Sequence, residues 1–379
     1  MRVLITGGAG FIGSHTADGL LDRGHEVTVL DALVPPVHAD RRFPEHLLER
    51  GVRWIDGDVR DRSAWERALD GVDAVYHLAA YQDYLPDFST FFTTNTASTA
   101  LLYEVLVARG QRLRRVVVAS SQAVYGEGAQ RCPECGEDEE LRPGARTAEQ
   151  LERGEWDLLC PHCGAALVPD WTEEEETRPH NAYAISKYAQ EQIALALGAR
   201  YDIPTVVLRY SIVQGSRQSF RNAYSGILRI FAQRILKGRP PVCYEDGRQL
   251  RDYVSVHDVV RANLLALDDE RVVGQALNVG GGRRVSILEY ARLVAECSGV
   301  EVAPETPGTY RAGDTRHVFS SIDRMAQLGW KPEVPLGEIV REYLDWASAQ
   351  AGFIDATTDA DLRMKSLGTV RQSHPVRSS

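Results

Sequence analysis

Blocks of apolar and polar residues alternate through the first half of the chain. Short apolar runs rich in β-branched residues lie at residues 2–6, 26–30, 52–58, 73–80 and 113–121. Stretches with a helical pattern lie between them, at residues 11–24, 63–71 and 88–110. Strands that alternate with helices build βαβ units, in which helices cover both faces of a parallel sheet. The pattern therefore predicts an α/β fold with a doubly wound parallel sheet.

The alternation stops at about Ala129 and resumes with a predicted helix at residues 179–201 and a predicted strand at residues 204–210. The interruption is rich in Glu, Gly and Pro and contains four cysteines. We predict a first domain at residues 1–210 with an insertion at residues 129–172, a smaller mixed α/β lobe at residues 211–352, and a flexible tail at residues 353–379. Some segments of the second lobe are expected to return to the first domain.

Composition excludes two classes of function. The formal net charge is −10 and the pI is near 5.6, whereas a nucleic-acid-binding surface needs a basic face. No apolar run is long enough to span a bilayer, and the N-terminus begins directly with a predicted strand rather than an export signal. We expect a cytoplasmic protein that binds neither nucleic acid nor membrane.

Three glycines follow the first predicted strand and open the first predicted helix: Gly7, Gly10 and Gly13. Such a loop lets backbone approach a pyrophosphate, which the helix N-terminus then binds. Asp31 ends the second strand, where a carboxylate would bind the adenosine ribose and repel a 2′-phosphate, so NAD is favoured over NADP. The alternative is a structural turn with Asp31 as a helix cap.

Tyr183 and Lys187 are four residues apart and therefore lie on one face of a predicted helix. An ammonium beside a phenol lowers the pKa of the phenol, which can then act as a base near neutral pH. This spacing alone is common on amphipathic helices. Its position after a dinucleotide-binding motif favours a catalytic role.

The insertion contains two C-x-x-C-G segments, at Cys132 and Cys135 and at Cys160 and Cys163. Two such hairpins can present four thiolates tetrahedrally to zinc. Four sulfur ligands leave no open position, so a zinc ion here would be structural and stiffen a lid or a dimer contact. The alternatives are redox-active dithiols or an empty zinc ribbon.

The glycine spacing G-x-x-G-x-x-G, Gly57-Asp58, the segment "HLAA" at residues 77–80 and the Tyr–Lys pair resemble the extended short-chain dehydrogenase/reductase family. The resemblance implies a Rossmann-type NAD-binding domain. Asp58 and Val59 would hold the adenine, and Asn95 would steady the centre of the sheet, although it could also be a helix-surface amide. The NAD-binding positions implied here are Gly7, Gly10, Phe11, Ile12, Gly13, Asp31, Asp58, Val59, Leu78, Ala79, Ala80, Asn95, Ser120, Tyr183, Lys187 and Tyr210.

The end of the strand at residues 113–121 bears on the reaction. Ser121 falls where the family places the Ser or Thr that shares the substrate hydroxyl with the tyrosine; it could also be a buried serine bonded to backbone. Dehydratases and decarboxylases of the family carry an acid just after this position, where this chain has Gln122 and Ala123. The catalytic groups Tyr183, Lys187 and Ser121 therefore favour hydride transfer at one carbinol carbon.

The second half resembles the substrate lobe of nucleotide-sugar epimerases up to about Trp346. By this resemblance Arg251, Arg311 and Asn222 would bind the diphosphate, and Tyr210 would touch the nicotinamide amide. Ordinary salt bridges, such as Arg251 with Asp252 or Asp258, are the alternative. The full set of predicted substrate-binding residues is Ser121, Gln122, Tyr183, Asn222, Arg251 and Arg311.

The sequence thus predicts an NAD-dependent nucleotide-sugar epimerase that inverts C4 through a 4-keto intermediate and keeps its NAD tightly bound. The segment order, with its cysteine insertion, also resembles bacterial epimerases of dTDP-6-deoxyhexoses. Ile212 replaces an amide that usually contacts the sugar, so the identity of the sugar is not determined by the sequence. The alternatives are a nucleotide-sugar 4-ketoreductase or dehydrogenase, and less favourably a 4,6-dehydratase or an NAD-sensing scaffold. A homodimer is implied through the helices that carry Asn95 and Tyr183.

Overall fold

A computed structural model describes residues 1–35, 37–38, 40–83, 85–135, 140–141, 143–221, 226–350 and 356–374. The seven strands of its central sheet are β1 (Arg2–Thr6), β2 (Glu26–Asp31), β3 (Arg53–Asp56), β4 (Ala74–His77), β5 (Arg115–Ser121), β9 (Thr205–Tyr210) and β13 (Ala276–Val279). All pairs are parallel, and the order is β13-β9-β5-β4-β1-β2-β3. This confirms the predicted fold. The order reverses between β1 and β4, where such sheets bind ligands beyond the strand ends.

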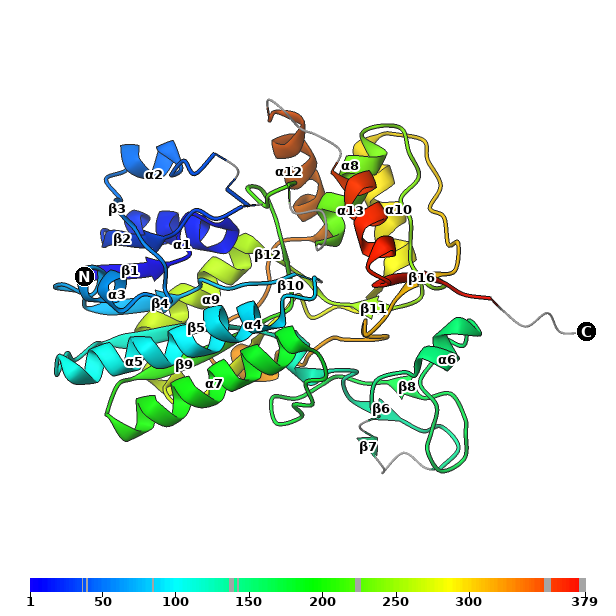
Figure 1. The fold of residues 1–379 in the computed structure, drawn as a ribbon, viewed down its shortest axis with the longest axis horizontal. Coiled ribbons are helices and arrows are strands. Elements are labelled where there is room, and N and C mark those ends of the chain that lie inside the picture. The colour runs from blue at the N-terminus through cyan, green and yellow to red at the C-terminus, as the bar shows by residue number, and fades with distance from the viewer. Residues whose placement is uncertain are drawn as a thin grey trace, which may run out of the picture.

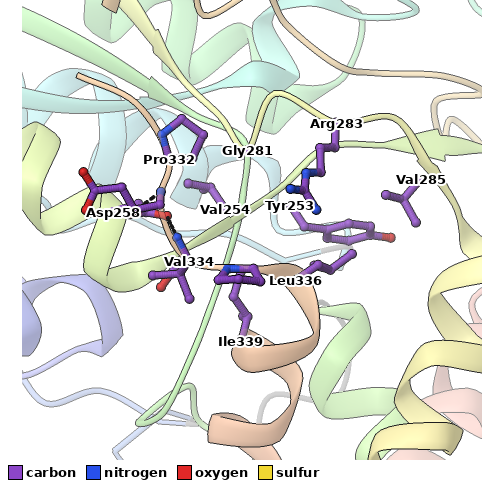
Figure 2. A pocket seen from close by; sticks show the side chains of 13 residues that line it. Tyr253, Val254, Asp258, Gly281, Arg283, Val285, Pro332, Val334, Leu336 and Ile339 are labelled. Carbon is purple, nitrogen blue, oxygen red and sulfur yellow. Dashed lines mark hydrogen bonds between the residues drawn. The ribbon is translucent and has the colours of Figure 1, made fainter. Parts of the chain in front are cut away.

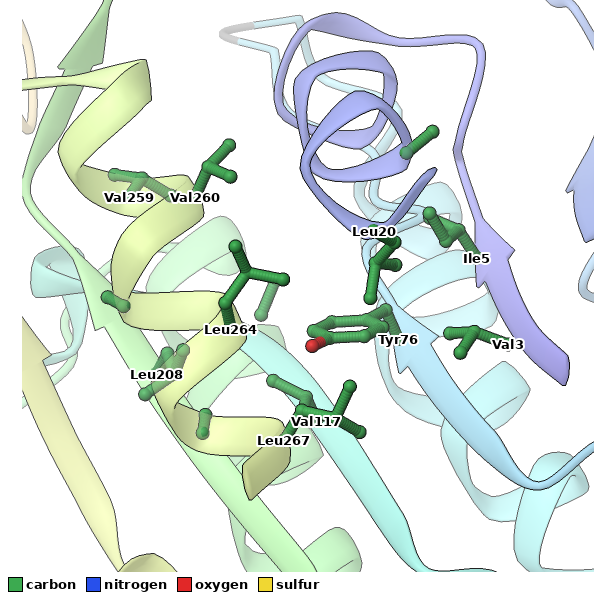
Figure 3. Close-up of a cluster of buried hydrophobic side chains, with 14 of the residues drawn as sticks. Val3, Ile5, Leu20, Tyr76, Val117, Leu208, Val259, Val260, Leu264 and Leu267 are labelled. Carbon is green, nitrogen blue, oxygen red and sulfur yellow. The ribbon is translucent and has the colours of Figure 1, made fainter. Parts of the chain in front are cut away.

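Helices cover both faces of this sheet (Figure 1). One face packs against α1 (Phe11–Asp22) and α9 (Val256–Asp268), and the other against α3 (Arg62–Ala68), α5 (Ser98–Ala108) and α7 (Ala182–Arg200). Successive strand residues point to opposite faces, so in β1 Val3 and Ile5 join the first core and Leu4 joins the second. In Figure 3 Leu20 of α1 and Leu264 of α9 approach this first face of the sheet. Burial on both faces explains why these strands read as continuous apolar runs.

The second lobe has its own core. It contains α8 (Ile227–Ile235), α10 (Ile287–Ser298), α12 (Leu336–Ser348), β10 (Ile212–Gln214), β11 (Leu250–Arg251), β12 (Tyr253–Ser255), β14 (Val285–Ser286) and β15 (Thr309–Arg311). The rings of Tyr253 and Tyr290 stack with centroids 4.1 Å apart inside this core. Shorter elements are α2 (Glu45–Glu49), α4 (Phe88–Phe91), the π-helix η1 (Phe92–Ala97), η2 (Gln122–Tyr125), η3 (Glu270–Val272) and α11 (Asp323–Gln327).

The four-cysteine insertion projects from the sheet below the second lobe in Figure 1. Its elements are β6 (Gln130–Arg131), β7 (Glu140–Leu141), β8 (Val168–Pro169) and α6 (Ala148–Glu152). A small core of Leu141, Leu158 and Leu167 packs with Cys132 and Cys160. So few apolar residues give the segment little stability without further links.

The C-terminal part differs from the predicted flexible tail. Within residues 356–374 the chain forms α13 (Thr357–Ser366) and β16 (Val370–Gln372), and β16 pairs with β15 in antiparallel register. Only Ala360, Met364 and Val370 supply buried apolar side chains, too few to give a visible pattern in the sequence. Pairing with β15, which is distant in the sequence, orders this segment. The secondary-structure preference of its own residues does not.

Among the helices in the described residues, none has the length and apolar character needed to cross a bilayer.

Candidate active site

The glycine loop connects β1 to α1 at the carboxyl edge of the sheet. Gly7 has φ +68°, and a Cβ atom on it would lie 2.8 Å from the backbone of Ala79. A Cβ atom on Gly13 would lie 2.3 Å from the carbonyl oxygen of Gly7. The loop therefore packs tightly against both the helix start and the β4 end. Because first-turn N–H groups of a helix lack intrahelical acceptors, the start of α1, which includes Phe11 and Ile12, can bind a pyrophosphate.

Two acids lie at the ends of β2 and β3, where the sequence predicted contacts with the adenosine. Asp31 accepts hydrogen bonds from the N–H groups of Ala9 (3.0 Å) and Leu33 (2.9 Å), and its burial raises its pKa. Asp58 is paired with Arg60 at 2.6 Å. Burial alone would raise the pKa of Asp58, but the hydrogen bonds from Arg60 lower it. Arg60 was not considered from the sequence.

The segment after β4 is tied to β1. Thr6 Oγ1 accepts a hydrogen bond from the N–H of Ala79 at 3.1 Å, and the Thr6 carbonyl accepts one from Leu78 at 3.2 Å. The buried His77 lies 2.8 Å from Thr6 Oγ1, and burial lowers its pKa to about 3. His77 is therefore neutral and structural, and it holds the segment that leads through Leu78 and Ala79 to the exposed Ala80.

Tyr183 and Lys187 lie on the first turns of α7, which begins where Asn181 accepts a hydrogen bond from the N–H of Ala184 at 2.9 Å. The half-buried Tyr183 ring contacts Phe91 edge to face, with centroids 6.3 Å apart. Lys187 is 2% exposed, and its Nζ donates to the Ala119 carbonyl and to Gln190. Burial lowers the pKa of Lys187 to about 7.

Asn95 is completely buried, so it is not a helix-surface amide. It lies in the π-helix η1 and exchanges hydrogen bonds of 2.8 and 3.0 Å with the backbone of Tyr81. Its Nδ2 also donates to Ser186 Oγ at 3.0 Å, directly beside Lys187. π-helical turns are often found at functional sites, and this one joins the β4 loop to the helix that carries Tyr183.

The residues at the end of β5 have different surroundings. Ser121 is half-buried, and its Oγ accepts a hydrogen bond from the N–H of Ala123 at 3.2 Å at the start of η2. Gln122 is 5% exposed. Ser120 donates to Glu191, which pairs with Arg209 at 2.7 Å in the core. No pattern in the sequence indicated this buried pair, which joins α7 to the sheet.

Two predicted ligand-binding residues have protein partners. The Tyr210 hydroxyl donates to Asn263 at 2.6 Å inside the core, so its expected contact with the nicotinamide remains a prediction. Arg251 donates to the carbonyls of Arg316 (2.9 Å) and Thr315 (2.6 Å).

Of the ordinary salt bridges considered as the alternative for Arg251, those with Asp252 and Asp258 do not form, but Arg251 Nη2 lies 3.8 Å from a carboxylate oxygen of Asp314. Asp252 instead accepts hydrogen bonds from the N–H groups of Gly281 and Arg283, at 3.0 and 3.3 Å. Asp258 pairs with Arg261 at 2.5 Å.

The remaining predicted substrate residues are Arg311 and Asn222. The guanidinium of Arg311 lies over the Tyr244 ring, 5.4 Å from its centroid, and its Nη2 donates to the Met364 sulfur at 3.6 Å. Arg311 is only 8% exposed. Asn222 lies outside the described residues.

The four sulfur atoms of Cys132, Cys135, Cys160 and Cys163 all lie within 4.8 Å of one another. Cys132 and Cys163 are 3.5 Å apart, and Cys135 and Cys160 are 3.7 Å apart. These distances exceed the roughly 2 Å of a disulfide bond. They match the separation of about 3.8 Å expected for thiolates bound tetrahedrally at about 2.3 Å from zinc.

Two hollows lie away from this edge. The cavity in Figure 2, about 60 Å³, is lined by Tyr253, Asp258 and Leu336, among others. An open groove of about 500 Å³ lies between Trp156 of the insertion and Arg248 of the second lobe. No predicted catalytic residue lines either, so the site is defined by the strand ends and by α7.

Comparison with known proteins matches the family model "NAD dependent epimerase/dehydratase family" at residues 3–148 and 164–280. A dTDP-L-rhamnose 4-epimerase of Burkholderia thailandensis is 32% identical over 355 residues, which cover 92% of this chain and 95% of that protein. The UDP-glucose 4-epimerase of Thermus thermophilus, solved with NAD, is 31% identical, with a TM-score of 0.72 over 93% of this chain and 100% of that one. The Thermotoga maritima UDP-glucose 4-epimerase, solved with UDP-glucose, is 28% identical, with a TM-score of 0.74 over 91% of this chain and 98% of that one.

Proposed function

The chain belongs to the NAD-dependent epimerase/dehydratase family, and from this premise we propose that it is an NAD-dependent nucleotide-sugar 4-epimerase. The observation that carries the proposal is the Tyr183–Lys187 pair on α7, in a chain that also has a tight glycine loop after β1 and an acid at the end of β2. Gln122 and Ala123 add no acid or base that could eliminate water or lose carbon dioxide. These groups support inversion of the configuration at one carbinol carbon.

The residues present fit NAD. The tight turn from Gly7 to Gly13 leads into a helix N-terminus, and Asp31 at the end of β2 suits an unphosphorylated ribose. When bound there, NAD would accept a hydride from the sugar and return it. Because there is no net oxidation, the cofactor can stay in place through many turnovers.

Tyr183 moves the proton in this mechanism. Its phenolic oxygen takes the proton of the sugar 4-hydroxyl, to which Ser121 also bonds. It returns the proton after the 4-keto sugar has rotated in the pocket to present its other face. The Lys187 ammonium favours the phenolate form of Tyr183. Burial has already lowered the pKa of Lys187 to about 7, so the lysine itself is poised to change charge near neutral pH.

The substrate is a nucleoside diphosphate sugar in this proposal. Arg251, Arg311 and Asn222 would bind its diphosphate, and Gln122 would line the sugar pocket with Ser121. The relative at 32% identity is named a dTDP-L-rhamnose 4-epimerase, and a structural relative was solved with UDP-glucose. Binding energy from the nucleotide, remote from C4, would keep the 4-keto intermediate from escaping.

Replacing Tyr183 by Phe tests the proposal, because the ring and its contact with Phe91 stay while the proton carrier is lost. We expect the purified wild-type protein and the purified variant both to contain NAD. We expect kcat to fall by about 10²- to 10⁴-fold in the variant. NAD release on denaturation and turnover of a nucleotide sugar are the two measurements. An unchanged kcat would leave an NAD-binding protein without this chemistry. Turnover that requires added NADH would indicate a ketoreductase.

We further infer that the four cysteines bind a structural zinc ion. Its shell would be closed, so it takes no part in the reaction. Two ion pairs fix the insertion to the second lobe: the buried pair of Arg146 with Glu245 at 2.9 Å, and the pair of buried Arg316 with half-exposed Asp157 at 2.8 Å. These links support a rigid clamp. None of the six cysteines, all of them in the described residues, forms a disulfide bond, which suits the cytoplasm, where we place the protein.

Cysteine replacement tests the zinc proposal. In Cys132→Ser/Cys135→Ser we expect about one equivalent of zinc to be lost and the melting temperature to fall, because metal binding supplies folding energy to a segment with a small core. Cys297→Ser, outside the insertion, is the control. Wild-type protein without zinc, or a double variant with unchanged zinc content and melting temperature, would contradict the inference.

We also propose a homodimer. Exposed apolar side chains lie on α4 and α5, which flank the Asn95-bearing η1, and on α7, which carries Tyr183: Phe88 of α4 is 60% exposed, Val107 of α5 is 39% and Ile185 of α7 is 42%. Contiguous exposed apolar residues mark association surfaces. Light scattering should give the mass of a dimer for wild type and of a monomer for Ile185→Glu; a monomeric wild type refutes the proposal.

A further inference from the structure

Lys187 has a glutamine partner one turn further along α7. Gln190 follows Lys187 by three residues, a spacing that places both side chains on the same face of the helix. Gln190 is completely buried, and its Oε1 accepts a hydrogen bond from Lys187 Nζ. The Ala119 carbonyl of β5 accepts a second hydrogen bond from the same Nζ. The ammonium is therefore held between α7 and the central sheet.

A buried threonine fixes the orientation of this amide. Gln190 Nε2 donates a hydrogen bond to Thr99 Oγ1 of α5 at 2.9 Å, and Thr99 Oγ1 donates to the Asn95 carbonyl of η1 at 2.8 Å. Thr99 is completely buried. A hydroxyl has one proton to donate, so while Thr99 donates to Asn95 it can only accept from Gln190. The amide must then turn its NH2 group toward Thr99 and its oxygen toward Lys187.

An acceptor oxygen at this place favours the charged form of Lys187. A hydrogen bond to the charged form of a group stabilises that form, and hydrogen bonds in a buried site are stronger than those in water. Burial has the opposite effect and lowers the pKa of Lys187 to about 7. Without the amide oxygen of Gln190, the lysine would lose its proton at a still lower pH.

Three other titratable side chains lie near Lys187. Against the effect of burial, the charge of Glu191 on α7 raises the pKa of Lys187, and Glu191 itself pairs with Arg209 of β9 at 2.7 Å. Burial and then the charge of Lys187 lower the pKa of His77 on β4 to about 3, so His77 stays neutral above that pH. Tyr183 lies one turn earlier on α7. The amide can therefore be removed by substitution without changing the charge of any of these neighbours.

We propose that Gln190 is a positioning residue, which holds Lys187 in place and maintains the ammonium charge that activates Tyr183. Thr99 orients Gln190 for this role. The inference rests on the proposed function, in which Tyr183 moves the proton and the ammonium favours its phenolate form. The Tyr–Lys spacing in the sequence does not include Gln190, and only the hydrogen bonds between α7, α5 and η1 indicate its role.

The test compares kcat of Gln190→Leu, which has no acceptor, with that of wild type at pH 8 and at pH 5.5, using a nucleotide sugar that wild type inverts. Loss of a hydrogen bond to a charged group should lower the pKa of Lys187 by about one unit. At pH 8 the phenolate–ammonium pair then becomes rarer relative to the neutral phenol and amine, and kcat should fall by about tenfold. At pH 5.5 the lysine is mostly protonated in both proteins, so kcat should stay within about twofold of wild type.

Two further variants separate positioning from general damage to the helix. Gln192→Leu replaces an exposed glutamine of α7 and should match wild type at both pH values. Gln190→Glu keeps an acceptor oxygen for the ammonium, so its kcat at pH 8 should stay within about threefold of wild type. A merely structural role of Gln190 would lower kcat of Gln190→Leu by the same factor at both pH values.

Thr99→Val tests the same role from the other end of the chain of hydrogen bonds. It removes the hydroxyl that orients Gln190, so kcat at pH 8 should fall by about threefold, with no further loss in a Gln190→Leu background. If Gln190→Leu does not fold, Thr99→Val decides by the same pH criterion. An equal loss of kcat at both pH values, or an unchanged kcat at pH 8, would overturn the inference. A wild-type protein that turns over no nucleotide sugar would refute the proposed function itself.

Discussion

At the scale of single residues, Gly13 shows how little space the glycine loop leaves. The obstacle to a Cβ atom there is backbone, the Gly7 carbonyl oxygen at 2.3 Å and the Gly8 Cα atom at 2.6 Å. Backbone cannot rotate away as a long side chain can, so a larger residue must displace the loop or the start of α1.

Replacing Gly13 by Ala should therefore lower the amount of NAD that copurifies and destabilise the fold by about 1–3 kcal/mol, the range for overpacked sites. NAD content and chemical denaturation measure the two effects. The control is Gly144→Ala, where a Cβ atom would meet nothing within 4 Å. Equal NAD content in the Gly13 variant, the control and wild type would mean that the loop is not a cofactor cradle.

Local sequence patterns predicted only some of the site. The glycine loop, Asp31 and the Tyr183–Lys187 spacing are visible because their geometry is set within one strand–turn–helix unit or one helix turn. The Ser120–Glu191–Arg209 network was missed because its partners come from β5, α7 and β9 and meet only when the sheet forms.

At the scale of elements, an ion pair joins the second lobe's α12 to α9. His257 lies 3.1 Å from Glu342. The hydrogen bond to Glu342 raises the pKa of His257, although burial opposes it. Burial alone would raise the pKa of Glu342, but the bonds from His257 and Ser216 lower it to about 2.

These shifts set a pH window. The His257 contribution to stability is complete below its ordinary pKa of 6.5 and is lost as the pH rises through the raised value. The Glu342 contribution is complete above 4.5 and is lost as the pH falls through about 2. The pair therefore stabilises most between about pH 4.5 and 6.5.

Glu342→Gln, which keeps an acceptor for Ser216, should lower the melting temperature more at pH 5.5 than at pH 8.5. Because His257 is half exposed, we expect a difference of only about 1 °C, as for a surface pair of about 0.5 kcal/mol. Thermal scans at both values measure it, with exposed Glu338→Gln on the same helix as the control. An equal loss at both pH values would assign the effect to packing.

As with the residues, some elements were predictable from the local sequence and others were not. β1, β4, β5 and β9 were predictable because apolar side chains fill both faces. The segment of α13 and β16 was not, because its order comes from Met364 and Val370 packing against the distant β15. The π-turn of η1 leaves no distinct signal in "FTTNTA".

At the scale of the whole molecule, the proposed active site would draw on two parts of the chain. The first domain would supply Tyr183 and the glycine loop, and the second lobe would supply Arg251 and Arg311. The insertion and the C-terminal segment are both fixed to that lobe, by Arg146 and by Met364. The sequence indicated the insertion by its cysteines and the C-terminal segment only as a tail, and it predicted neither attachment to the second lobe.

The central claim is that the purified protein inverts a nucleotide sugar without added cofactor. A proton NMR time course on separate samples of UDP-galactose, UDP-glucuronate, dTDP-L-rhamnose and GDP-mannose measures this directly. We predict that a new anomeric signal will grow to equilibrium with one of them, at a rate that Tyr183→Phe lowers by at least about 100-fold. No change with any of the four sugars, followed by turnover of a 4-keto sugar once NADH is supplied, would contradict the claim and identify a reductase.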